Sequence, residues 1–147
     1  MRALVERAGL GARVVIDSAG TAGYHAGEPS DRRSIAHARK RGYALTHVAR
    51  SFGARDFAAF DYVVAMDGSN YRSLERLAPD AAARAKLSML RLYEVAEDLR
   101  AGREPHDYED VPDPYYGEGD GFERVLDICE KSCAALLAHV QAKHALR

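Results

Sequence analysis

The sequence has few cysteines and no long apolar run. The 147 residues include only two cysteines, Cys129 and Cys133, and no tryptophan. The cysteines lie four positions apart, where an intrahelical disulfide is geometrically awkward, so they fit a reducing compartment. No stretch approaches the roughly 18 apolar residues of a membrane span, and residues 2–7 do not form a signal-peptide core. The sequence therefore predicts a cytoplasmic protein.

The sequence also lacks an excess of charge of either sign. Its formal net charge is −1, and basic and acidic residues are interspersed. No overall field would attract the chain to nucleic acid or to an anionic membrane, so neither partner is predicted. Hydrophobic residues make up 47% and charged residues 29%, ordinary values for a chain that folds. We expect a single domain spanning residues 1–147, with one core and one site.

Signatures of nucleotide and metal binding are missing as well. There is no Gly-x4-Gly-Lys-[Ser/Thr] phosphate-binding loop. The six histidines have no metal-ligand spacing, and the nearest pair, His139 and His144, would face different sides of a helix. Neither a metal nor a cofactor is predicted.

Short apolar runs alternate with helical patterns along the chain, and glycine, proline and capping residues set their expected ends. The expected helices cover residues 2–8 before Gly9, a segment from Ser30 or Asp31 to Gly42, and a segment from near Ser69 to before Pro79. The expected strands cover residues 13–17, 62–66 and 87–92. Such alternation predicts an α/β domain with a short, mostly parallel sheet, which binds ligands beyond the carboxyl ends of its strands.

The last helix has the clearest pattern. Asp120 and Glu123 resemble a capping box at its start. Its apolar residues recur at alternating spacings of four and three: Phe122, Leu126, Cys129, Cys133, Leu136 and Val140. Both cysteines lie on this apolar stripe, so we interpret them as small core residues rather than as nucleophiles.

The most specific loop motif is residues 113–117, with the sequence DPYYG. Pro112 and Pro114 flank Asp113, restrict the backbone and favour an extended conformation, so the carboxyl group can be aimed. An aimed carboxylic acid beside two tyrosines suggests proton donation to an aromatic leaving group. An isolated Asp-Pro pair would more often begin a turn, so the interpretation depends on the motifs around it.

Four further motifs accompany it in a recognisable order. They are residues 17–21 (DSAGT), 27–29 (GEP), 65–67 (AMD) and 69–70 (SN). In order and spacing, over its whole length, the sequence resembles the low-molecular-weight protein tyrosine phosphatases. This resemblance implies a three-layer phosphotyrosine phosphatase I-like fold, with helices on both faces of the sheet. It also implies hydrolysis of phosphotyrosine proteins or small aryl phosphates through a cysteinyl-phosphate intermediate.

The resemblance also implies roles for six residues. Asp113 is similar to the general acid that protonates the leaving phenolate, and Tyr115 and Tyr116 are similar to the tyrosine pair at the mouth of the active site. Tyr24 matches the aromatic position of the loop opposite. Ser18 and His47 resemble the polar residues that support the nucleophile loop from behind.

One departure from the family affects the activity. The family's nucleophile lies in a Cys-x5-Arg loop, but Ala135 stands six positions after Cys129 and His139 six after Cys133. We expect that the chain begins inside the family's first helix, without the first strand and the nucleophile loop, and that as written it is inactive. One of three outcomes would then follow: direct re-pairing of the strands at 13–17 and 61–66, a strand donated by another copy, or a cavity near Ser18 and Asp113.

Two alternatives from other classes remain. The first is a catalytically dead module that binds phosphate or phosphoproteins, helped by the basic helix at residues 32–41, although a solvated face is the more ordinary interpretation of that helix. The second is a redox protein of the arsenate-reductase type, which would need exposed relay cysteines. The apolar stripe argues against it. A homodimer is left open.

Overall fold

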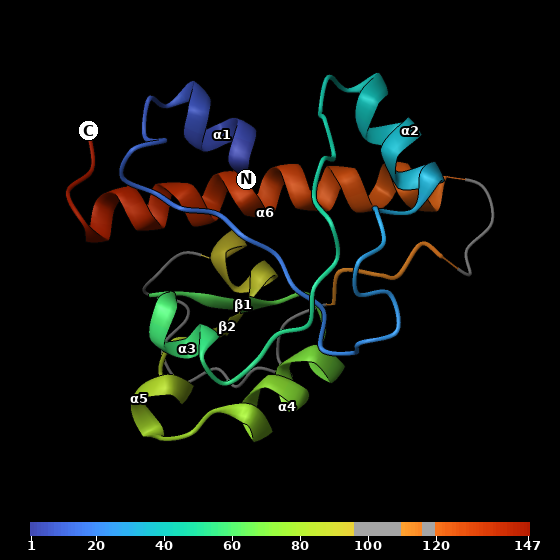
Figure 1. The fold of residues 1–147 in the computed structure, drawn as a ribbon. Helices are drawn as coiled ribbons and strands as arrows, with labels where there is room; N and C mark the ends of the chain where they lie inside the picture. The colour runs from blue at the N-terminus through green and yellow to red at the C-terminus, as the bar shows by residue number, and fades with distance from the viewer. Residues whose placement is uncertain (96–109, 116–119) are drawn as a thin grey trace.

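The computed structural model describes residues 1–95, 110–115 and 120–147. It has an α/β fold, drawn in Figure 1, in which short strands are embedded among helices. The elements, in chain order, are α1 (Arg2–Arg7), α2 (Arg32–Lys40), α3 (Asp56–Ala59), β1 (Val63–Ala65), α4 (Gly68–Leu77), α5 (Ala81–Arg84), β2 (Leu87–Met89), the 3-10 helix η1 (Leu90–Glu94) and α6 (Gly121–Lys143). Tyr116 lies outside the described residues.

The sheet of the described residues consists of β1 and β2. They pair in parallel, with Val63 opposite Leu87 and Ala65 opposite Met89. Because side chains alternate along a strand, Val63 and Ala65 face one side of the sheet and Val64 faces the other. Residues 62–66 were expected to form a parallel strand covered on both faces, and β1 confirms the core of that prediction.

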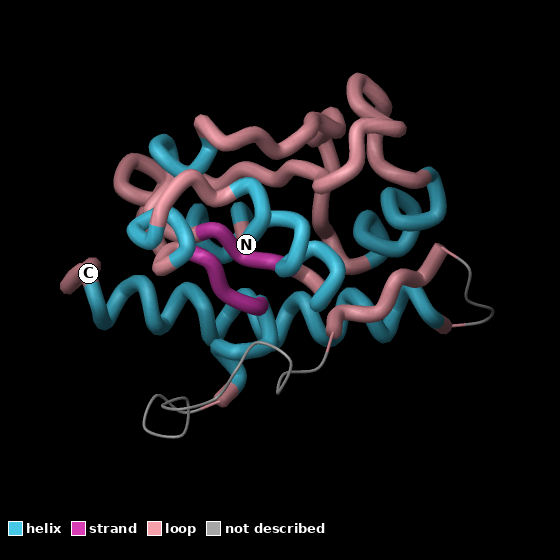
Figure 2. Tube along the Cα trace, turned by 90° about the horizontal axis from the view of Figure 1, so that it is seen from below, coloured by secondary structure: helices cyan, strands magenta, loops and turns pink. Residues whose placement is uncertain are grey.

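Helices cover both faces of the sheet and give the three layers that Figures 1 and 2 show. On one side, α3, α4 and α5 supply Phe57, Leu74, Ala78 and Ala83 to a buried cluster with the side chains of Val63 and Ala65. On the other side, the long helix α6 brings Leu136 and Val140 against Leu90, Tyr93 and Val111. The parallel sheet and its two helical layers confirm the predicted fold class.

Several helix ends lie where the sequence places them. The Asp31 carboxylate accepts hydrogen bonds from the backbone N–H groups of Arg33 and Ser34, so it caps α2 as expected. Gly9, just beyond α1, and Gly42, just beyond α2, have φ of 69° and 80°. This left-handed conformation ends a helix at little cost only when the residue is glycine.

Two predicted strands are wrong in whole or in part. Residues 13–17 were expected to form a buried strand, but no ladder includes them and the Val15 side chain is 78% exposed. An apolar run forms a strand only where a neighbouring backbone edge pairs with it, and residues 13–17 have none among the described residues. The prediction for residues 87–92 was too long, because the chain turns into η1 at Leu90.

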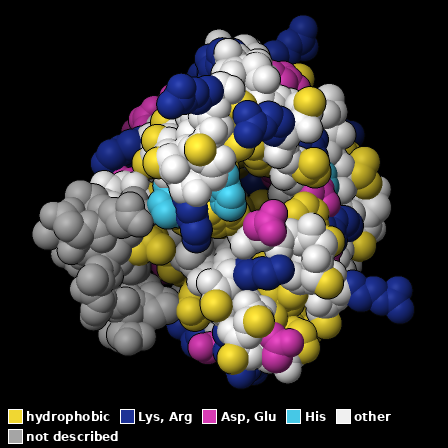
Figure 3. Space-filling view, turned by 90° about the vertical axis from the view of Figure 1, so that its left-hand side faces the viewer, with side chains coloured by type: hydrophobic (Ala, Val, Ile, Leu, Met, Phe, Trp, Pro, Cys, Tyr) yellow, Lys and Arg dark blue, Asp and Glu magenta, His cyan; other side chains and the backbone are white. Residues whose placement is uncertain are grey.

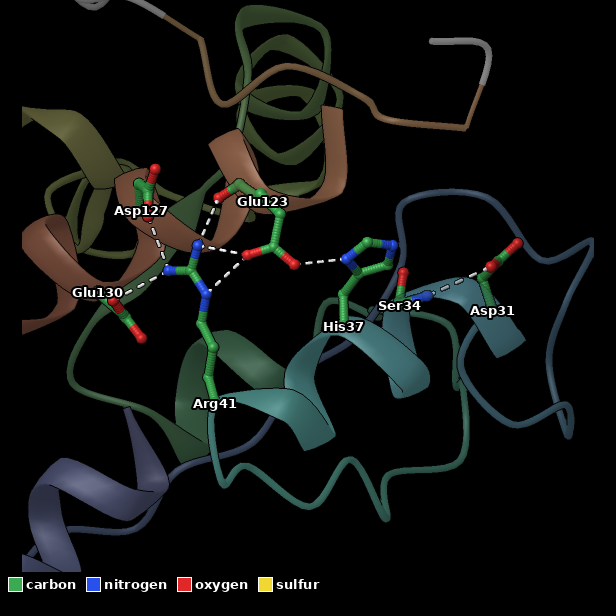
Figure 4. Close-up of polar contacts among 7 residues, drawn as sticks. All are labelled: Asp31, Ser34, His37, Arg41, Glu123, Asp127 and Glu130. Atoms are coloured by element: carbon green, nitrogen blue, oxygen red, sulfur yellow. Dashed lines mark hydrogen bonds and ion pairs between the residues drawn. The ribbon is translucent and has the colours of Figure 1, made fainter. Parts of the chain in front are cut away.

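The start of α6 also differs from the predicted capping box. Asp120 precedes the helix but makes no side-chain capping bond. The Glu123 carboxylate contacts His37 Nδ1 at 2.5 Å and accepts from Arg41 Nη2 at 2.6 Å, which joins α6 to α2 (Figure 4). His37 of α2 and Arg41, the residue that follows α2, thus replace the local backbone donor that a capping box would use. Arg41 further contacts Asp127 at 2.7 Å and Glu130 at 3.1 Å.

Candidate functional site

A first group of predicted site residues converges on Asp17, at the end of the segment from residue 13. The Ser18 backbone N–H donates to Asp17 Oδ1 at 2.8 Å, and His47 Nδ1 lies 3.9 Å from the same oxygen. The segment carrying Ser18 and the one carrying His47 lie together because Gly20 pairs with Ser51 in an isolated parallel bridge. The structure therefore brings together Ser18 and His47, which the sequence places 29 positions apart.

Arg50 extends this group and fixes the charge of Asp17. Its guanidinium donates to Asp17 Oδ2 at 2.9 Å and to Asp56 Oδ2 at 3.0 Å. Desolvation acts against the charged form of Asp17, but the Ser18 N–H and the Arg50 guanidinium outweigh it and lower the pKa of Asp17. Asp17 is thus an anion that aligns its neighbours. Sequence analysis included Asp17 in the motif at residues 17–21 without a role and missed Arg50, because the two residues lie 33 positions apart and give no local signal.

A second group surrounds Asp113 on the segment of residues 110–115. The segment is anchored to the end of β1, because the Val111 N–H donates to the Met66 carbonyl at 2.8 Å. The Asp110 carboxylate accepts from the Gly68 N–H at 2.9 Å, at the start of α4. The Asp113 side chain is exposed and accepts from the backbone N–H of Tyr115 at 2.9 Å. Its carboxyl group is therefore oriented by its own loop while it remains accessible.

Arg33 of α2 holds the other end of this loop. Its guanidinium carbon lies 5.1 Å from the centre of the Tyr115 ring and 4.9 Å from that of Phe122, a cation–π arrangement with each ring. Its Nη1 also donates to the Tyr115 carbonyl at 3.4 Å. The sequence suggested only a basic, solvated face for this helix. The contact spans 82 positions, so no local pattern could have identified it.

The remaining predicted residues are not joined to either group. Tyr24 is 88% exposed. Among the residues that the structure describes, no hydrogen bond or ion pair connects Asp113 with Ser18, Tyr24 or His47. Tyr116 is not among the described residues. The described residues around the predicted positions therefore form two separate groups, one at Asp17 and one at Asp113.

A groove opens between residues 13–18 and residues 61–66, with a volume of about 680 Å³. Its walls include Val15, Ile16 and Val64, and its floor includes Cys133, Leu136 and Val140 of α6. Figure 3 looks at one end of the molecule, where hydrophobic and histidine side chains surround a hollow. Ser18 lines the groove, whereas Asp113 does not. Of the three expected outcomes for this region, the structure shows a cavity near Ser18, and direct re-pairing of the two segments is wrong.

Both cysteines pack against the buried cluster of α6, as the apolar stripe predicted. Burial raises the pKa of the Cys129 thiol to about 11, so at neutral pH this group is a thiol rather than a nucleophilic thiolate. Among the described residues, no three histidine, cysteine or acidic side chains are grouped to hold a metal ion. None of the described helices is both long and apolar enough to span a membrane.

Comparison with known proteins gives a consistent result. Residues 1–146 match the family of low molecular weight phosphotyrosine protein phosphatases. The low molecular weight protein-tyrosine-phosphatase of Streptomyces coelicolor is 47% identical over 140 residues, which cover 95% of this chain and 81% of the relative. The human low molecular weight phosphotyrosine protein phosphatase is 37% identical over 123 residues, covering 83% and 72%.

A solved structure supports the same relationship. One similar structure is the crystal structure of a protein tyrosine phosphatase from Entamoeba histolytica with Hepes in its active site. The match covers 98% of this chain and 85% of the Entamoeba chain, with a TM-score of 0.82 and 30% sequence identity. The layered fold and these similarities define an α/β protein of the phosphotyrosine phosphatase class. The chain belongs to the low molecular weight phosphotyrosine protein phosphatase family. The family resemblance of the sequence is confirmed.

Proposed function

We propose that this chain forms the general-acid and substrate-binding part of a protein tyrosine phosphatase that works through a cysteinyl-phosphate intermediate. In this proposal Asp113 protonates the leaving phenolate, and Tyr115, Tyr116 and Tyr24 border the cleft for the aromatic ring. Ser18 and His47 position the nucleophile loop from behind. The substrates are phosphotyrosine proteins or small aryl phosphates, and the compartment is the cytoplasm.

The observation that carries this proposal is the anchoring of the Asp113 loop. A general acid must be accessible to the leaving oxygen and held in one orientation. Asp113 meets both needs, because it is exposed and bonded to the Tyr115 N–H. Val111 ties the loop to Met66 at the end of β1, and Arg33 ties it to α2. Ligand sites in such folds lie at this end of the strands.

The missing chemical group is the nucleophile. The chain contains no Cys-x5-Arg sequence, and its cysteines are packed on α6. Covalent catalysis without a nucleophile leaves the general acid with no step to assist. We therefore expect the purified 147-residue chain to hydrolyse para-nitrophenyl phosphate no faster than the buffer. Turnover that disappears in Cys129→Ser or Cys133→Ser would contradict this and assign a different nucleophile.

A longer version that carries a Cys-x5-Arg loop ahead of residue 1 tests the role of Asp113. We expect it to hydrolyse aryl phosphates, and Asp113→Asn to slow turnover by roughly a hundred- to ten-thousand-fold for a poorly acidic phenol. The matched control is Asp120→Asn, which makes the same chemical change at an exposed acid near the loop. The loss should shrink for an acidic phenol, which leaves without a proton. An equal rate for Asp113→Asn and the control would remove Asp113 from the mechanism.

The second candidate is a module that binds phosphorylated partners without turnover, and the absence of a nucleophile favours it. The basic segment at residues 32–41 supports phosphate binding less than its sequence suggests. Arg33 and Arg41 both already bind other groups within the molecule. A redox function of the arsenate-reductase type is the weakest candidate, since the raised pKa of Cys129 suppresses its thiolate. Phosphotyrosine peptide binding without hydrolysis, in the longer version, would favour the binding module. A homodimer is open to test by sedimentation.

A further inference from the structure

The Arg33 guanidinium is held in one orientation by the first turn of its own helix. Its Nε donates to Asp31 Oδ1 at 3.2 Å and its Nη2 to Asp31 Oδ2 at 3.1 Å, and this pairing of a planar fork with a carboxylate fixes the plane of the guanidinium. The same carboxylate accepts the backbone N–H groups of Arg33 and Ser34 at the start of α2. The hydrogen bond to Asp31 also raises the pKa of Arg33, which keeps it cationic. The helix cap and the cation therefore form one unit.

The helix that carries Arg33 is itself fixed against α6. Figure 4 shows the Glu123 carboxylate between His37 and Arg41, which it contacts at 2.5 and 2.6 Å. The His37 ring also stacks on the Phe122 ring, with the ring centres 5.4 Å apart and the planes 11° from parallel. Phe122 is the same ring that lies 4.9 Å from the Arg33 guanidinium carbon. Arg33 therefore projects from a junction of two helices and not from a free helix end.

The loop of Asp113 packs on this junction. The Arg33 guanidinium carbon lies 5.1 Å from the centre of the Tyr115 ring, and its Nη1 donates to the Tyr115 carbonyl at 3.4 Å. Because that hydrogen bond is long, the contact with the ring is the stronger of the two. Pro114 lies against the start of α6, where a Cβ placed on Gly121 would be 3.7 Å from the Pro114 Cβ. The two residues that follow Asp113 therefore contact α2 and the first turn of α6.

Tyr115 transmits the position of Arg33 to the acid. Its ring and carbonyl contact Arg33, and its backbone N–H donates to Asp113 Oδ1 at 2.9 Å. A rotation of this residue would turn the N–H that orients the carboxyl group. We propose that Arg33 is a positioning residue for the general acid: by fixing Tyr115, it keeps the carboxyl group of Asp113 in the orientation that delivers a proton. The inference rests on the proposed function of Asp113.

NMR on the 147-residue chain tests the orientation without any activity. In the unaltered protein, the Tyr115 amide proton should shift as Asp113 titrates, because it donates to that carboxylate. Arg33→Met keeps the aliphatic stem and removes the cation and its donors. It should shrink this pH-dependent shift and speed Tyr115 amide exchange roughly five- to thirtyfold, the change that loss of two exposed cation–π contacts allows. Arg32→Met is the control and should change neither, since Arg32 is exposed and makes no ion pair or side-chain hydrogen bond within the described part of the chain.

Two conservative variants separate the orientation of the guanidinium from its charge. Arg33→Lys keeps the charge but replaces the planar fork by a point ammonium, so Tyr115 exchange should fall between that of the unaltered protein and that of Arg33→Met. Asp31→Asn keeps an acceptor for the helix cap and removes the charged partner of Arg33, and it should speed the exchange less than Arg33→Met does. If Arg33→Met does not fold, these two variants still decide, and unaltered exchange in both would overturn the proposal.

The longer version with a Cys-x5-Arg loop ahead of residue 1 tests the effect on chemistry. Arg33→Met should lower kcat/KM roughly five- to thirtyfold for a poorly acidic phenol and less for an acidic one, because only the first needs the proton. In the Asp113→Asn background, the same change should have no further effect, since there is no acid left to position. An equal loss in both backgrounds would mean that Arg33 does not act through Asp113, and would overturn the proposal.

The two experiments also separate this proposal from the function proposed for Asp113. If Arg33→Met and Arg32→Met leave Tyr115 equally ordered, the positioning role of Arg33 is overturned whatever the rates are. If Arg33→Met loosens Tyr115 but Asp113→Asn does not slow the longer version, the general-acid function fails. Arg33 then orders a loop without a role in proton transfer, which overturns the proposal for a different reason.

Discussion

The two faces of the sheet are stabilised in different ways. The face toward α3, α4 and α5 is closed by apolar side chains, and Leu74 and Met89 retain only 4% and 2% of their exposure. The layer of α6 on the other face is joined to α2 by ion pairs and opens into the groove beside β1. One face of the sheet is therefore closed by apolar packing, and the other face borders an open groove.

This contrast predicts that apolar residues of equal hydrophobicity differ greatly in their effect on stability. An aliphatic side chain that loses all contact with water contributes about 1.5 to 3 kcal/mol, but an exposed one contributes almost nothing. Leu74 lies in the closed cluster, whereas the Val15 side chain borders the groove and is 78% exposed. Replacing each side chain by alanine therefore compares the contribution of a buried apolar residue to stability with that of an exposed one.

The largest expected effect is that of Leu74→Ala. It should lower the free energy of unfolding by about 2 to 5 kcal/mol, because it removes contacts and leaves a cavity in a closed cluster. The control Val15→Ala should stay within about 0.5 kcal/mol. Urea titrations followed by circular dichroism measure both. A loss for Val15→Ala as large as for Leu74→Ala would mean that the groove is closed in solution.

The sequence predicted the elements whose signals are local. The N-cap Asp31, the glycines after α1 and α2, and the end of α4 before Pro79 depend on residues within one helical turn. The motif at residues 113–117 identified the family because its residues are contiguous. The alternation of strand and helix was enough for the fold class, since each element is amphipathic or apolar by itself.

Features that depend on residues far apart in the sequence could not be predicted from such local signals. Residues 13–17 have the composition of a strand, but a strand exists only when a paired edge lies beside it. Glu123 satisfies the pattern of a capping box, yet His37 and Arg41 lie 86 and 82 positions away and bind it more strongly. The contacts of Arg33 with Tyr115 and of Asp17 with Arg50 likewise appear only after folding.

A middle-sized effect is expected where charges join the two helices of the second layer. Hydrogen bonding to His37 and then to Arg41 lowers the pKa of Glu123 below its ordinary value. A carboxyl group with a lowered pKa in the folded state adds stability above its unfolded pKa of about 4.3, and this stability is lost as the pH falls through the folded value. Glu123→Gln should therefore reduce stability at pH 7 and make its loss on acidification less steep.

Urea titrations of the protein and of Glu123→Gln from pH 7 to pH 3 measure this difference. The two curves should differ most near neutrality and converge at the acid end. Glu75→Gln on α4 is the control, because the Glu75 side chain is exposed and has no ion pair among the described residues. A constant gap between Glu123→Gln and the unaltered protein at all pH values would show that packing, rather than charge, holds α2 to α6.

The smallest effect compares two aspartates that precede helices. Asp31 caps α2 through two backbone N–H groups, whereas Asp120 stands before α6 and makes no capping bond. Asp31→Ala should lower the free energy of unfolding by about 1 kcal/mol, and Asp120→Ala should leave it within about 0.5 kcal/mol. Asp31 also pairs with the Arg33 guanidinium at 3.1 Å, so the difference between the two variants reports the capping bonds together with this ion pair. Equal losses in urea titration would mean that Asp120 caps α6 in solution, and would restore the capping box that the sequence predicted.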